Sequence, residues 1–276
     1  MPFLQCGRYT LDLSIPRVMG VVNVTPDSFS DGGRHATLEA AVAHARRLVE
    51  EGADLLDIGG ESTRPGAAPV SEAEELERVL PLVEALRDAG VPLSVDTAKP
   101  AVMRAVLDAG ADMINDIRAF DTPEALAAVA GGQCGVCAMH MRGEPRTMQQ
   151  APRYDDVVAE VRDFLAARAG ALRDAGVAAR RICLDPGFGF GKTAEHNFRL
   201  LHELPALAAA GYPLLIGVSR KSMIGAATGK PVGERTAGSV AAALAAIARG
   251  AAIVRVHDVA ATVDAIKVWR AVEAAS

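Results

Sequence analysis

The sequence predicts an α/β protein, in which a closed barrel of eight parallel strands, each followed by a helix, forms a single domain over residues 1–276. Two observations lead to this fold class. Eight short apolar runs alternate with long, Ala-rich amphipathic segments, and polar residues follow the point where each run ends. A doubly wound open sheet is the alternative, and the count of eight strand–helix units favours closure into a (β/α)8 TIM barrel.

The eight apolar runs are the predicted strands. After an N-terminal stretch that could form a short hairpin, each apolar run is rich in Val, Ile and Leu at consecutive positions, as in a strand buried on both faces. These strands cover residues 17–23, 55–60, 92–96, 112–116, 135–140, 181–185, 214–219 and 252–257.

Predicted helices fill the intervals between the strands. Several end in Ala-Gly or Gly-Ala, which is typical of a helix C-cap. Ser71, followed three residues later by Glu74, has the pattern of a capping box at a helix N-terminus. The helices cover residues 37–52, 71–90, 99–110, 121–132, 154–176, 195–210, 233–250 and 259–274.

Composition excludes several classes of protein. A net charge of −5 and a sequence pI near 5.7 argue against a surface that coats nucleic acid. The N-terminus lacks the pattern of a signal peptide, and no apolar run reaches the ~20 residues of a membrane span. Four cysteines in 276 residues do not make a disulfide framework. We therefore expect a reduced, cytoplasmic protein without a nucleic-acid or membrane partner.

One pair of cysteines has the spacing of a redox site. Cys134 and Cys137 form a C-x-x-C pattern, which in some proteins is redox-active. A redox pair should open a helix after a strand, whereas "GVCAMH" is typical of the buried strand itself. The sequence favours two small core residues over a redox site.

Polar side chains crowd where the predicted strands end, and in a parallel barrel these ends meet at one mouth. Any one of them could be a solvated loop residue or a helix cap. Eight strand ends that converge on one mouth are much harder to explain in this way. The residues are Asn23, Glu61, Ser62, Thr63, Arg64, Asp96, Asn115, Asp116, His140, Asp185, Ser219, Arg220, Lys221, Arg255 and His257.

This set has a definite chemical character. Asp96, Asn115 and Asp185 offer hydrogen-bond acceptors and an amide, which suit the N–H edge of a flat, nitrogen-rich heterocycle. Lys221 follows the seventh strand and can reach into the mouth. The donors suited to phosphate oxygens are Arg64, Arg255 and His257.

The stretch "DPGFGFGKT", residues 185–193, resembles a phosphate-binding loop, but the spacing fails. A Walker loop needs glycine five positions before its last glycine, and Pro186 stands there. The dinucleotide fingerprint fails as well, because the glycines are spaced G-x-G-x-G. We expect the glycines to turn the backbone sharply after Asp185 and to place Phe188 and Phe190 at the rim of a pocket.

Together these motifs resemble the dihydropteroate synthases of folate biosynthesis. The motifs run in the family's order over almost the whole chain. They are "GVVNVTPDSFSDGG" (20–33), "DIGGESTRPGA" (57–67), "SVDTAKPAV" (94–102), "INDI" (114–117), "MHMRGEPRTMQ" (139–149), "DPGFGFGKTAEHN" (185–197), "GVSRKSMIG" (217–225) and "RVHDV" (255–259).

The resemblance implies a reaction that joins 6-hydroxymethyl-7,8-dihydropterin diphosphate to 4-aminobenzoate and releases diphosphate. It implies Mg²⁺ as the cofactor, with Asn23 as the protein ligand, sulfonamide-type inhibitors and a homodimer. The Ala-rich segment 238–250 could pack flat against a second subunit.

The resemblance also implies roles for individual residues. The catalytic set is Asp96, Asp185, Lys221, Arg255 and His257. The pterin set is Asp96, Asn115, Asp185, Gly217 and Lys221. The diphosphate set is Asn23, Thr63, Arg64, Arg255 and His257. The 4-aminobenzoate set is Thr63, Pro65, Phe190, Ser219, Arg220 and Ser222.

Two Gly/Pro/Ser-rich segments, 24–36 and 60–70, are long for connections between a strand and the following helix. They could be disordered surface, whereas the resemblance implies mobile loops that close over the diphosphate and exclude water. The residues assigned to these loops are Asp27, Ser28, Phe29, Asp31, Arg64 and Gly66.

Two other functions are open to a chain of this pattern. A pterin-dependent methyltransferase needs a folate pocket but no diphosphate site, and Asn23 with Arg255 and His257 argue against it. A pterin-binding barrel without activity should have lost Lys221, Arg255 or Asn23, and all three are present.

Overall fold

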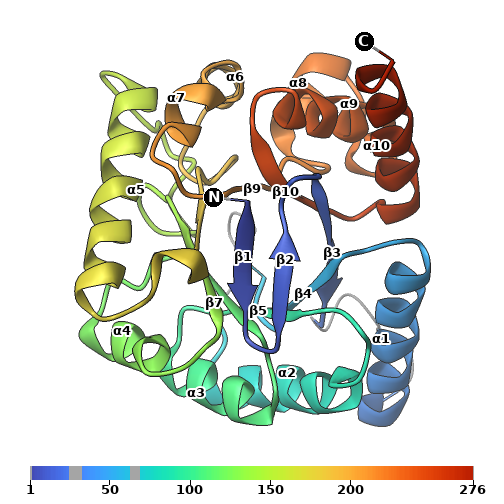
Figure 1. Cartoon of the computed structure of the whole chain (residues 1–276), viewed down its shortest axis with the longest axis vertical. Coiled ribbons are helices and arrows are strands. Elements are labelled where there is room, and N and C mark those ends of the chain that lie inside the picture. The colour runs from blue at the N-terminus through green and yellow to red at the C-terminus, as the bar shows by residue number, and fades with distance from the viewer. Residues whose placement is uncertain (1, 25–32, 63–68, 276) are drawn as a thin grey trace.

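The predicted barrel is confirmed in the computed structural model, which describes residues 2–24, 33–62 and 69–275. Eight parallel strands close in the order β10-β3-β4-β5-β6-β7-β8-β9, and the helices surround them (Figure 1). The strands are β3 (Arg17–Asn23), β4 (Leu55–Gly59), β5 (Leu93–Asp96), β6 (Met113–Asp116), β7 (Gly135–Met139), β8 (Ile182–Asp185), β9 (Leu214–Ile216) and β10 (Ala251–Val256).

The helices that follow these strands agree with the prediction to within a few residues. Ser71 and Glu74 form the predicted capping box at the start of α2. The helices are α1 (Gly33–Glu50), α2 (Glu72–Leu86), α3 (Pro100–Ala109), α4 (Pro123–Ala130), α5 (Val157–Asp174), α6 (Ala194–His202), α7 (Leu204–Ala208), α8 (Ser222–Thr228), α9 (Thr236–Ile247) and α10 (Val259–Glu273). Single 3-10 turns, η2 (Ala179–Arg181) and η3 (Val232–Glu234), precede β8 and α9.

Two boundaries differ from the prediction. The segment 195–210 is not one helix but two, α6 and α7, which meet at Glu203. Pro205 lies in the first turn of α7, and a proline there cannot donate a backbone hydrogen bond to a preceding helical turn. The predicted strand 214–219 is too long at its carboxyl end. The observed strand β9 ends at Ile216, and the chain then turns toward α8.

The N-terminal hairpin is confirmed and lies across the amino-terminal end of the barrel (Figure 1). Strands β1 (Phe3–Cys6) and β2 (Tyr9–Asp12) pair antiparallel. Their turn residue Gly7 has a φ of 52°, and a Cβ there would lie 2.6 Å from Asp112 Oδ1. Arg8 then binds the same carboxylate, with Nη2 2.9 Å from Asp112 Oδ2. The hairpin is thus fixed to the strand ends that it covers.

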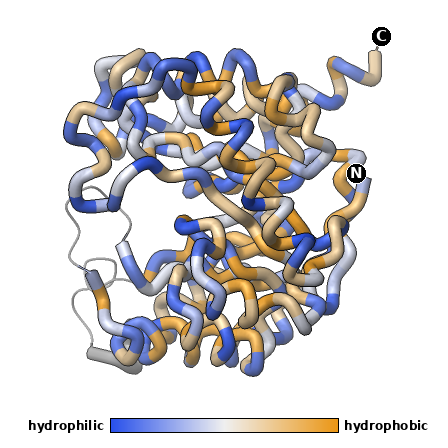
Figure 2. Tube along the Cα trace, turned by 90° about the vertical axis from the view of Figure 1, so that its left-hand side faces the viewer, coloured by the Kyte–Doolittle hydropathy of each residue, from blue (hydrophilic) through white to orange (hydrophobic). Residues whose placement is uncertain are grey.

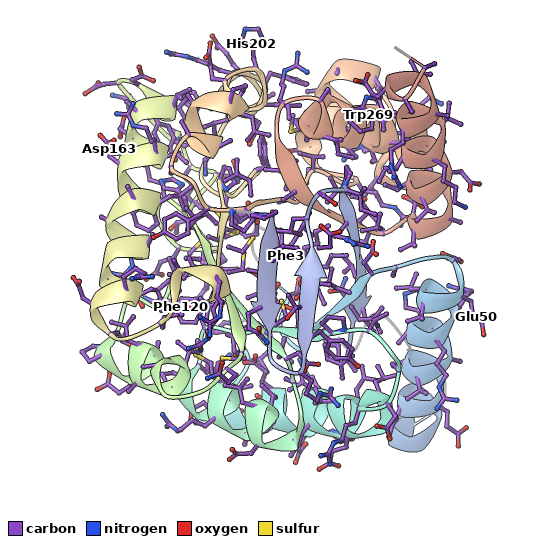
Figure 3. All side chains as sticks on the ribbon, in the orientation of Figure 1. Phe3, Glu50, Phe120, Asp163, His202 and Trp269 are labelled. Atoms are coloured by element: carbon purple, nitrogen blue, oxygen red, sulfur yellow. The ribbon has the colours of Figure 1, made fainter. Side chains whose placement is uncertain are left out.

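Apolar side chains form two layers. The larger cluster lies between the strands and the surrounding helices, and the smaller one fills the barrel interior beneath the hairpin with Leu4, Cys6, Met19, Leu55, Met113, Cys137, Cys183, Leu215 and Ile253. Hydrophobic segments accordingly gather inside the molecule in Figure 2. In Figure 3, Glu50, Asp163 and His202 lie at the periphery on helices, whereas Phe120 lies inward.

Two expectations from composition concern the cysteines and membrane-spanning segments. Cys134 and Cys137 are both buried and free, so the prediction of core residues is confirmed. Among the described helices, none is long and apolar enough to cross a membrane.

Candidate active site

A cavity of about 960 Å³ opens at the carboxyl ends of the strands. Most of the residues that the sequence placed at the mouth line it. They are Asn23, Asp96, Asn115, Asp185, Phe190, Gly217, Ser219, Arg220, Lys221, Ser222, Arg255 and His257. Eight other predicted site residues, Asp27, Ser28, Phe29, Asp31, Thr63, Arg64, Pro65 and Gly66, lie outside the described residues.

Acceptor groups occupy one side of this cavity. Asp96 and Asn115 are register partners at the ends of β5 and β6. The oxygen Oδ1 of Asn115 is buried and has no hydrogen-bond partner among the described residues. Burial and the nearby Asp57 carboxylate raise the pKa of Asp96 to about 7. This side of the cavity therefore offers acceptors to a ligand with N–H donors.

An ion-pair network holds the same side in place. The Arg255 Nε lies 2.6 Å from Asp57 Oδ2, and Arg255 Nη2 lies 3.4 Å from Asp96 Oδ2. Burial alone would lower the pKa of Arg255, but Asp57 and Asp96 raise it above its ordinary value. The Asn115 Nδ2 group donates to Asp57 Oδ2 over 3.2 Å. Arg255, Asp96 and Asn115 therefore belong to this network and also line the cavity.

Asp185 and Lys221 face each other across the next strands. Asp185 ends β8 and is 6% exposed, and its Oδ1 accepts from the Gly187 N–H at 2.7 Å. Burial raises the pKa of Asp185, and Lys221 opposes that shift. Burial lowers the pKa of Lys221 to about 8, against the attraction of Asp185. The Lys221 ammonium donates to the Phe188 carbonyl and lies 4.5 Å from the centroid of the Phe190 ring.

The turn after Asp185 has the glycine geometry expected from the sequence. Gly187, Gly189 and Gly191 all have positive φ values, of 69°, 80° and 64°. At Gly187 a Cβ would lie 1.8 Å from the His140 carbonyl oxygen, so a side chain cannot be accommodated. Phe190 lines the cavity, as expected. The placement of Phe188 at the rim is wrong, because its side chain is 0% exposed and belongs to the hydrophobic core.

The position of the Lys192 side chain explains why this turn is not a phosphate-binding loop. Its side chain is buried, and Nζ lies 2.8 Å from His140 Nδ1, 2.9 Å from the Gly187 carbonyl oxygen and 3.1 Å from the Phe190 carbonyl oxygen. Burial lowers the pKa of Lys192 well below its ordinary value. The lysine therefore supports the turn from inside and does not face the cavity.

The opposite rim carries donors and hydroxyl groups. His257 contacts Ser219, with Nδ1 3.0 Å from Ser219 Oγ. Arg220 binds Asp258 through two nitrogens, Nε at 3.0 Å and Nη2 at 2.6 Å. Arg255 lies on β10 and His257 directly follows this strand, and both residues line the cavity.

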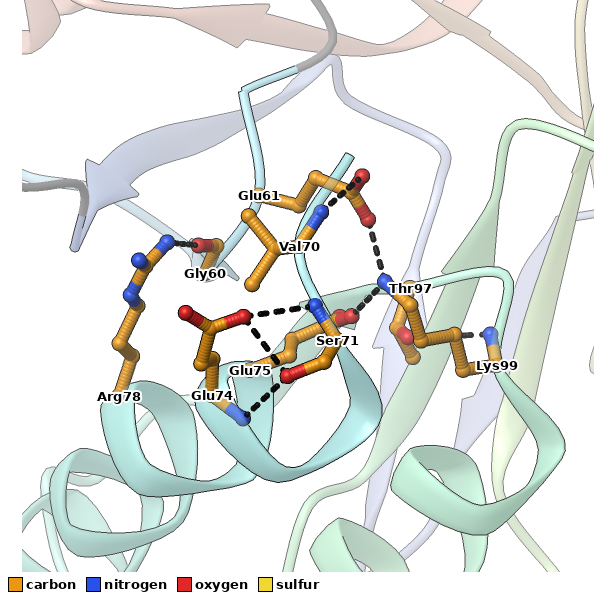
Figure 4. Close-up of polar contacts among 9 residues, drawn as sticks. All are labelled: Gly60, Glu61, Val70, Ser71, Glu74, Glu75, Arg78, Thr97 and Lys99. Atoms are coloured by element: carbon orange, nitrogen blue, oxygen red, sulfur yellow. Dashed lines mark hydrogen bonds and ion pairs between the residues drawn. The ribbon is translucent and has the colours of Figure 1, made fainter. Parts of the chain in front are cut away.

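A network beside the cavity anchors both ends of the segment between Glu61 and Ser71 (Figure 4). Lys99 binds the carboxylates of Glu61 and Glu75, and Glu61 Oε1 accepts from the Val70 N–H at 3.1 Å. Arg78 Nη1 donates to the Gly60 carbonyl oxygen over 2.8 Å. These contacts hold the two ends of the segment that carries the 4-aminobenzoate candidates in a fixed relation to the barrel.

The described residues at this mouth include few groups that could bind a metal ion. Within the described ranges, no group of three or more His, Cys, Asp or Glu side chains could hold a metal ion. Asn23 ends β3 and lines the cavity, and its Oδ1 lies 3.5 Å from where a Cβ of Gly59 would stand. One neutral amide oxygen suits Mg²⁺ only when phosphate oxygens supply further ligands.

The comparisons with known proteins decide the family. The model of the family "Pterin binding enzyme" matches residues 19–257. A dihydropteroate synthase of Neisseria meningitidis serogroup C is 54% identical over 97% of this chain and 96% of its own length. That of Escherichia coli strain K12 is 52% identical over 95% of this chain and 93% of its own. The chain belongs to the dihydropteroate synthase family.

Solved structures of dihydropteroate synthases have the same fold as this chain. The enzyme of Xanthomonas albilineans with 4-aminobenzoic acid superposes with a TM-score of 0.93 at 59% identity, over 99% of this chain and 98% of that one. The enzyme of Burkholderia cenocepacia with 7,8-dihydropteroate gives 0.91 at 62% identity, over 99% and 97%. A Yersinia pestis dihydropteroate synthase with a sulfonamide drug gives 0.93 at 50% identity, over 99% and 100%.

Sequence reasoning missed several residues of this dihydropteroate synthase. Further cavity residues that it did not single out are Ile117, Met139, Met148, Gln149, Gly189, Val232 and Gly233. Asp57 lies below the cavity and was also missed. A charged residue inside the apolar run "LLDIGG" is the signal that could have found it, because a buried carboxylate needs a partner.

Lys192→Met is expected to destabilise the dihydropteroate synthase fold by about 1–3 kcal/mol, because it removes a buried donor to the Gly187 and Phe190 carbonyls, of which the Gly187 carbonyl keeps the Phe190 N–H. Urea denaturation measures this free energy of unfolding. Lys267→Met is the matched control, since the Lys267 side chain is 71% exposed. Equal stability of the Lys192 variant and the control would refute the supporting role of Lys192.

Proposed function

We propose that the cavity joins 6-hydroxymethyl-7,8-dihydropterin diphosphate to 4-aminobenzoate through the residues that line it. The observation that carries the proposal is the close grouping of acceptors and cations: Asp96, Asn115 and Asp185 next to Lys221 and Arg255 in one cavity. The acceptors suit the N–H groups of a pterin ring, and the cations suit the oxygens of the ring and the diphosphate.

In the proposed reaction the bond between the pterin methylene carbon and the diphosphate oxygen breaks, and its electron pair leaves with diphosphate. The amine nitrogen of 4-aminobenzoate then bonds to this carbon and releases a proton to solvent. Asp96 and Asp185 stabilise positive charge that develops on the pterin. Arg255 and His257 bind the diphosphate with Asn23, Thr63 and Arg64.

The remaining cavity residues frame 4-aminobenzoate. Phe190 offers a ring face, while Ser219, Arg220 and Ser222 supply polar groups toward a carboxylate. Thr63 and Pro65 complete this set in the proposal. The same subsite is proposed to take sulfonamides, which the related Yersinia pestis enzyme binds.

The direct test is an assay of diphosphate release that requires both substrates together. Release that depends on 4-aminobenzoate, with dihydropteroate formed in equal amount, is the expected result. Release at the same rate without 4-aminobenzoate would indicate hydrolysis and would reject the proposed transfer. Lys221→Met is expected to reduce the transfer, and Lys267→Met on the exposed face of α10 serves as its control.

Mg²⁺ is expected to bind only together with diphosphate. When bound, the ion neutralises charge on the leaving diphosphate, and Asn23 is the proposed protein ligand. Because an amide is a weak neutral ligand, calorimetric titration of Mg²⁺ should show heat of binding with diphosphate present and none without it. Tight stoichiometric binding in the absence of diphosphate would contradict this prediction.

Pterin affinity is expected to rise with pH through about 7, where Asp96 ionises. The ionised carboxylate is the better acceptor for a ring N–H, so the protonated form below this pH binds less tightly. Fluorescence quenching of 6-hydroxymethylpterin between pH 5 and 8 measures the effect. Asp96→Asn should lose this pH dependence; the same dependence in that variant would assign it to another group.

The proposed quaternary state is a homodimer in the cytoplasm. Helices α9 and α10 offer the contact surface, because α9 is Ala-rich and Val268 and Val272 on α10 are exposed. Four buried free thiols suit a reducing compartment.

A further inference from the structure

Asp57 is a fully buried charged residue directly below the active site. It lies in the middle of β4, where it is the register partner of Ser94, one inward position below the layer of Gly59 and Asp96. Its side chain is 0% exposed. Burying a carboxylate costs free energy unless cations or hydrogen-bond donors surround it. The contacts of Asp57 therefore indicate its role.

The first contact fixes a cation. Arg255 Nε lies 2.6 Å from Asp57 Oδ2, while its Nη2 lies at a longer 3.4 Å from Asp96 Oδ2. Arg255 is thereby held between a carboxylate below the cavity and one that lines it. Without Asp57, the guanidinium would be free to move onto Asp96 and cover its oxygens.

The second contact fixes an amide. Asn115 Nδ2 lies 3.2 Å from the same Asp57 Oδ2. If the amide turned over, its oxygen would face the carboxylate, and two acceptors at this distance repel each other. The carboxylate therefore selects one orientation, in which Asn115 Oδ1 is left buried without a partner in the described part of the chain. Asn115 lines the cavity, so this oxygen is the group that remains for a ligand.

We propose that Asp57 is a positioning residue for pterin recognition. It limits Arg255 to a single long contact with Asp96, and it orients Asn115 so that the cavity presents an acceptor, not an NH2 donor, to the ring. This inference rests on the proposed function, because it takes the ligand of the cavity to be a pterin. Asp57 itself acts through Arg255 and Asn115, and not by touching the ring.

Two substitutions of Asp57 and one control test the proposal. Asp57→Ala removes the acceptor, and Asp57→Asn keeps an oxygen that both donors can share. Ser94→Ala removes a buried hydroxyl of the adjacent strand that has no hydrogen-bond partner among the residues the structure describes. The probe is 6-hydroxymethylpterin, with affinity measured by fluorescence quenching. Asp57→Ala should weaken binding by about tenfold to a hundredfold, whereas Asp57→Asn and Ser94→Ala should stay within about threefold of the unmodified protein.

The orientation of Asn115 can be observed independently of binding. The chain has three asparagines, Asn23, Asn115 and Asn197, so selective ¹⁵N-asparagine labelling gives three side-chain NH2 signals that single substitutions can assign. The Asn115 signal should shift and exchange faster with solvent in Asp57→Ala. It should keep its position and protection in Ser94→Ala. An unchanged Asn115 signal in Asp57→Ala would overturn the proposal.

The binding data separate this inference from the proposed function. Failure of the unmodified protein to bind 6-hydroxymethylpterin would reject the proposed ligand. Normal binding by the unmodified protein and by Asp57→Ala alike would reject only the role of Asp57. Equal losses in Asp57→Asn and Asp57→Ala would also reject it, because the acceptor geometry is preserved in the first variant. If Asp57→Ala does not fold, Asp57→Asn keeps the proposal falsifiable, because a loss of pterin affinity beyond about threefold in that variant would reject it.

Discussion

Asp185→Asn is expected to weaken the binding of 6-hydroxymethylpterin by about 1.5–3 kcal/mol, which is the usual value of a hydrogen bond to a charged group. The Asp185 Oδ1 accepts from the Gly187 N–H at 2.7 Å. An asparagine must keep its oxygen at that position, so its NH2 group takes the place of Oδ2. This NH2 group would then face an N–H donor of the pterin ring, and two donors do not form a hydrogen bond. Calorimetry with the unreactive pterin measures the loss.

Asp116→Asn is the matched control for this experiment. Asp116 also ends a strand, is buried, and accepts from backbone N–H groups, those of Arg118 at 2.8 Å and Phe120 at 2.7 Å. It points away from the cavity, since the neighbouring Asn115 points into it. The control should lower stability and leave pterin affinity unchanged. A similar loss of affinity in both variants would mean that Asp185 has no specific place in pterin recognition.

Arg255→Ala is expected to lower the free energy of unfolding by about 3–5 kcal/mol, because it leaves the buried Asp57 carboxylate without its cation. The Arg255 side chain is 21% exposed and that of Asp57 is 0% exposed, so solvent screens this pair poorly. Urea denaturation of the ligand-free protein measures the change. The same variant should lose the binding of free diphosphate.

Arg220→Ala provides the comparison. Its pair with Asp258 is bidentate but more exposed than the Arg255–Asp57 pair, at 36% and 18%, so its loss should cost about 1 kcal/mol or less. The double variant Asp57→Ala/Arg255→Ala should regain part of the stability, because the buried Asp57 carboxylate that Arg255→Ala leaves unpaired is then absent. Equal costs for Arg255→Ala and Arg220→Ala would show that burial does not govern the energetics of the first pair.

Much of the fold followed from local patterns in the sequence. The eight apolar runs, including "RVMGVVN" and "AIVRVH", become strands because parallel strands are buried on both faces and need consecutive apolar residues. The polar residues at their ends meet because parallel strands all end at one mouth. The site could thus be predicted as a set before any tertiary contact was known.

The errors and omissions depend on contacts between distant segments. Phe188 belongs to the core and Phe190 to the cavity because the positive-φ glycines direct alternate side chains to opposite sides, which spacing alone does not reveal. The spacing excludes a phosphate-binding loop at residues 185–193, but only the carbonyls around Lys192 show that its side chain is internal. Asp57 was missed because its partner Arg255 lies 198 positions away in the sequence.

The N-terminal hairpin has a kinetic consequence. Leu4, Cys6 and Leu11 seal the amino-terminal end of the barrel against Met19, Leu55 and Ile253, so ligands reach the deep acceptors from the mouth alone. In the proposed arrangement the pterin binds at the bottom of the cavity and 4-aminobenzoate at the rim, which constrains the order in which the two substrates bind. A molecule at the rim obstructs entry of the deeper one, and the product must depart before the next pterin enters.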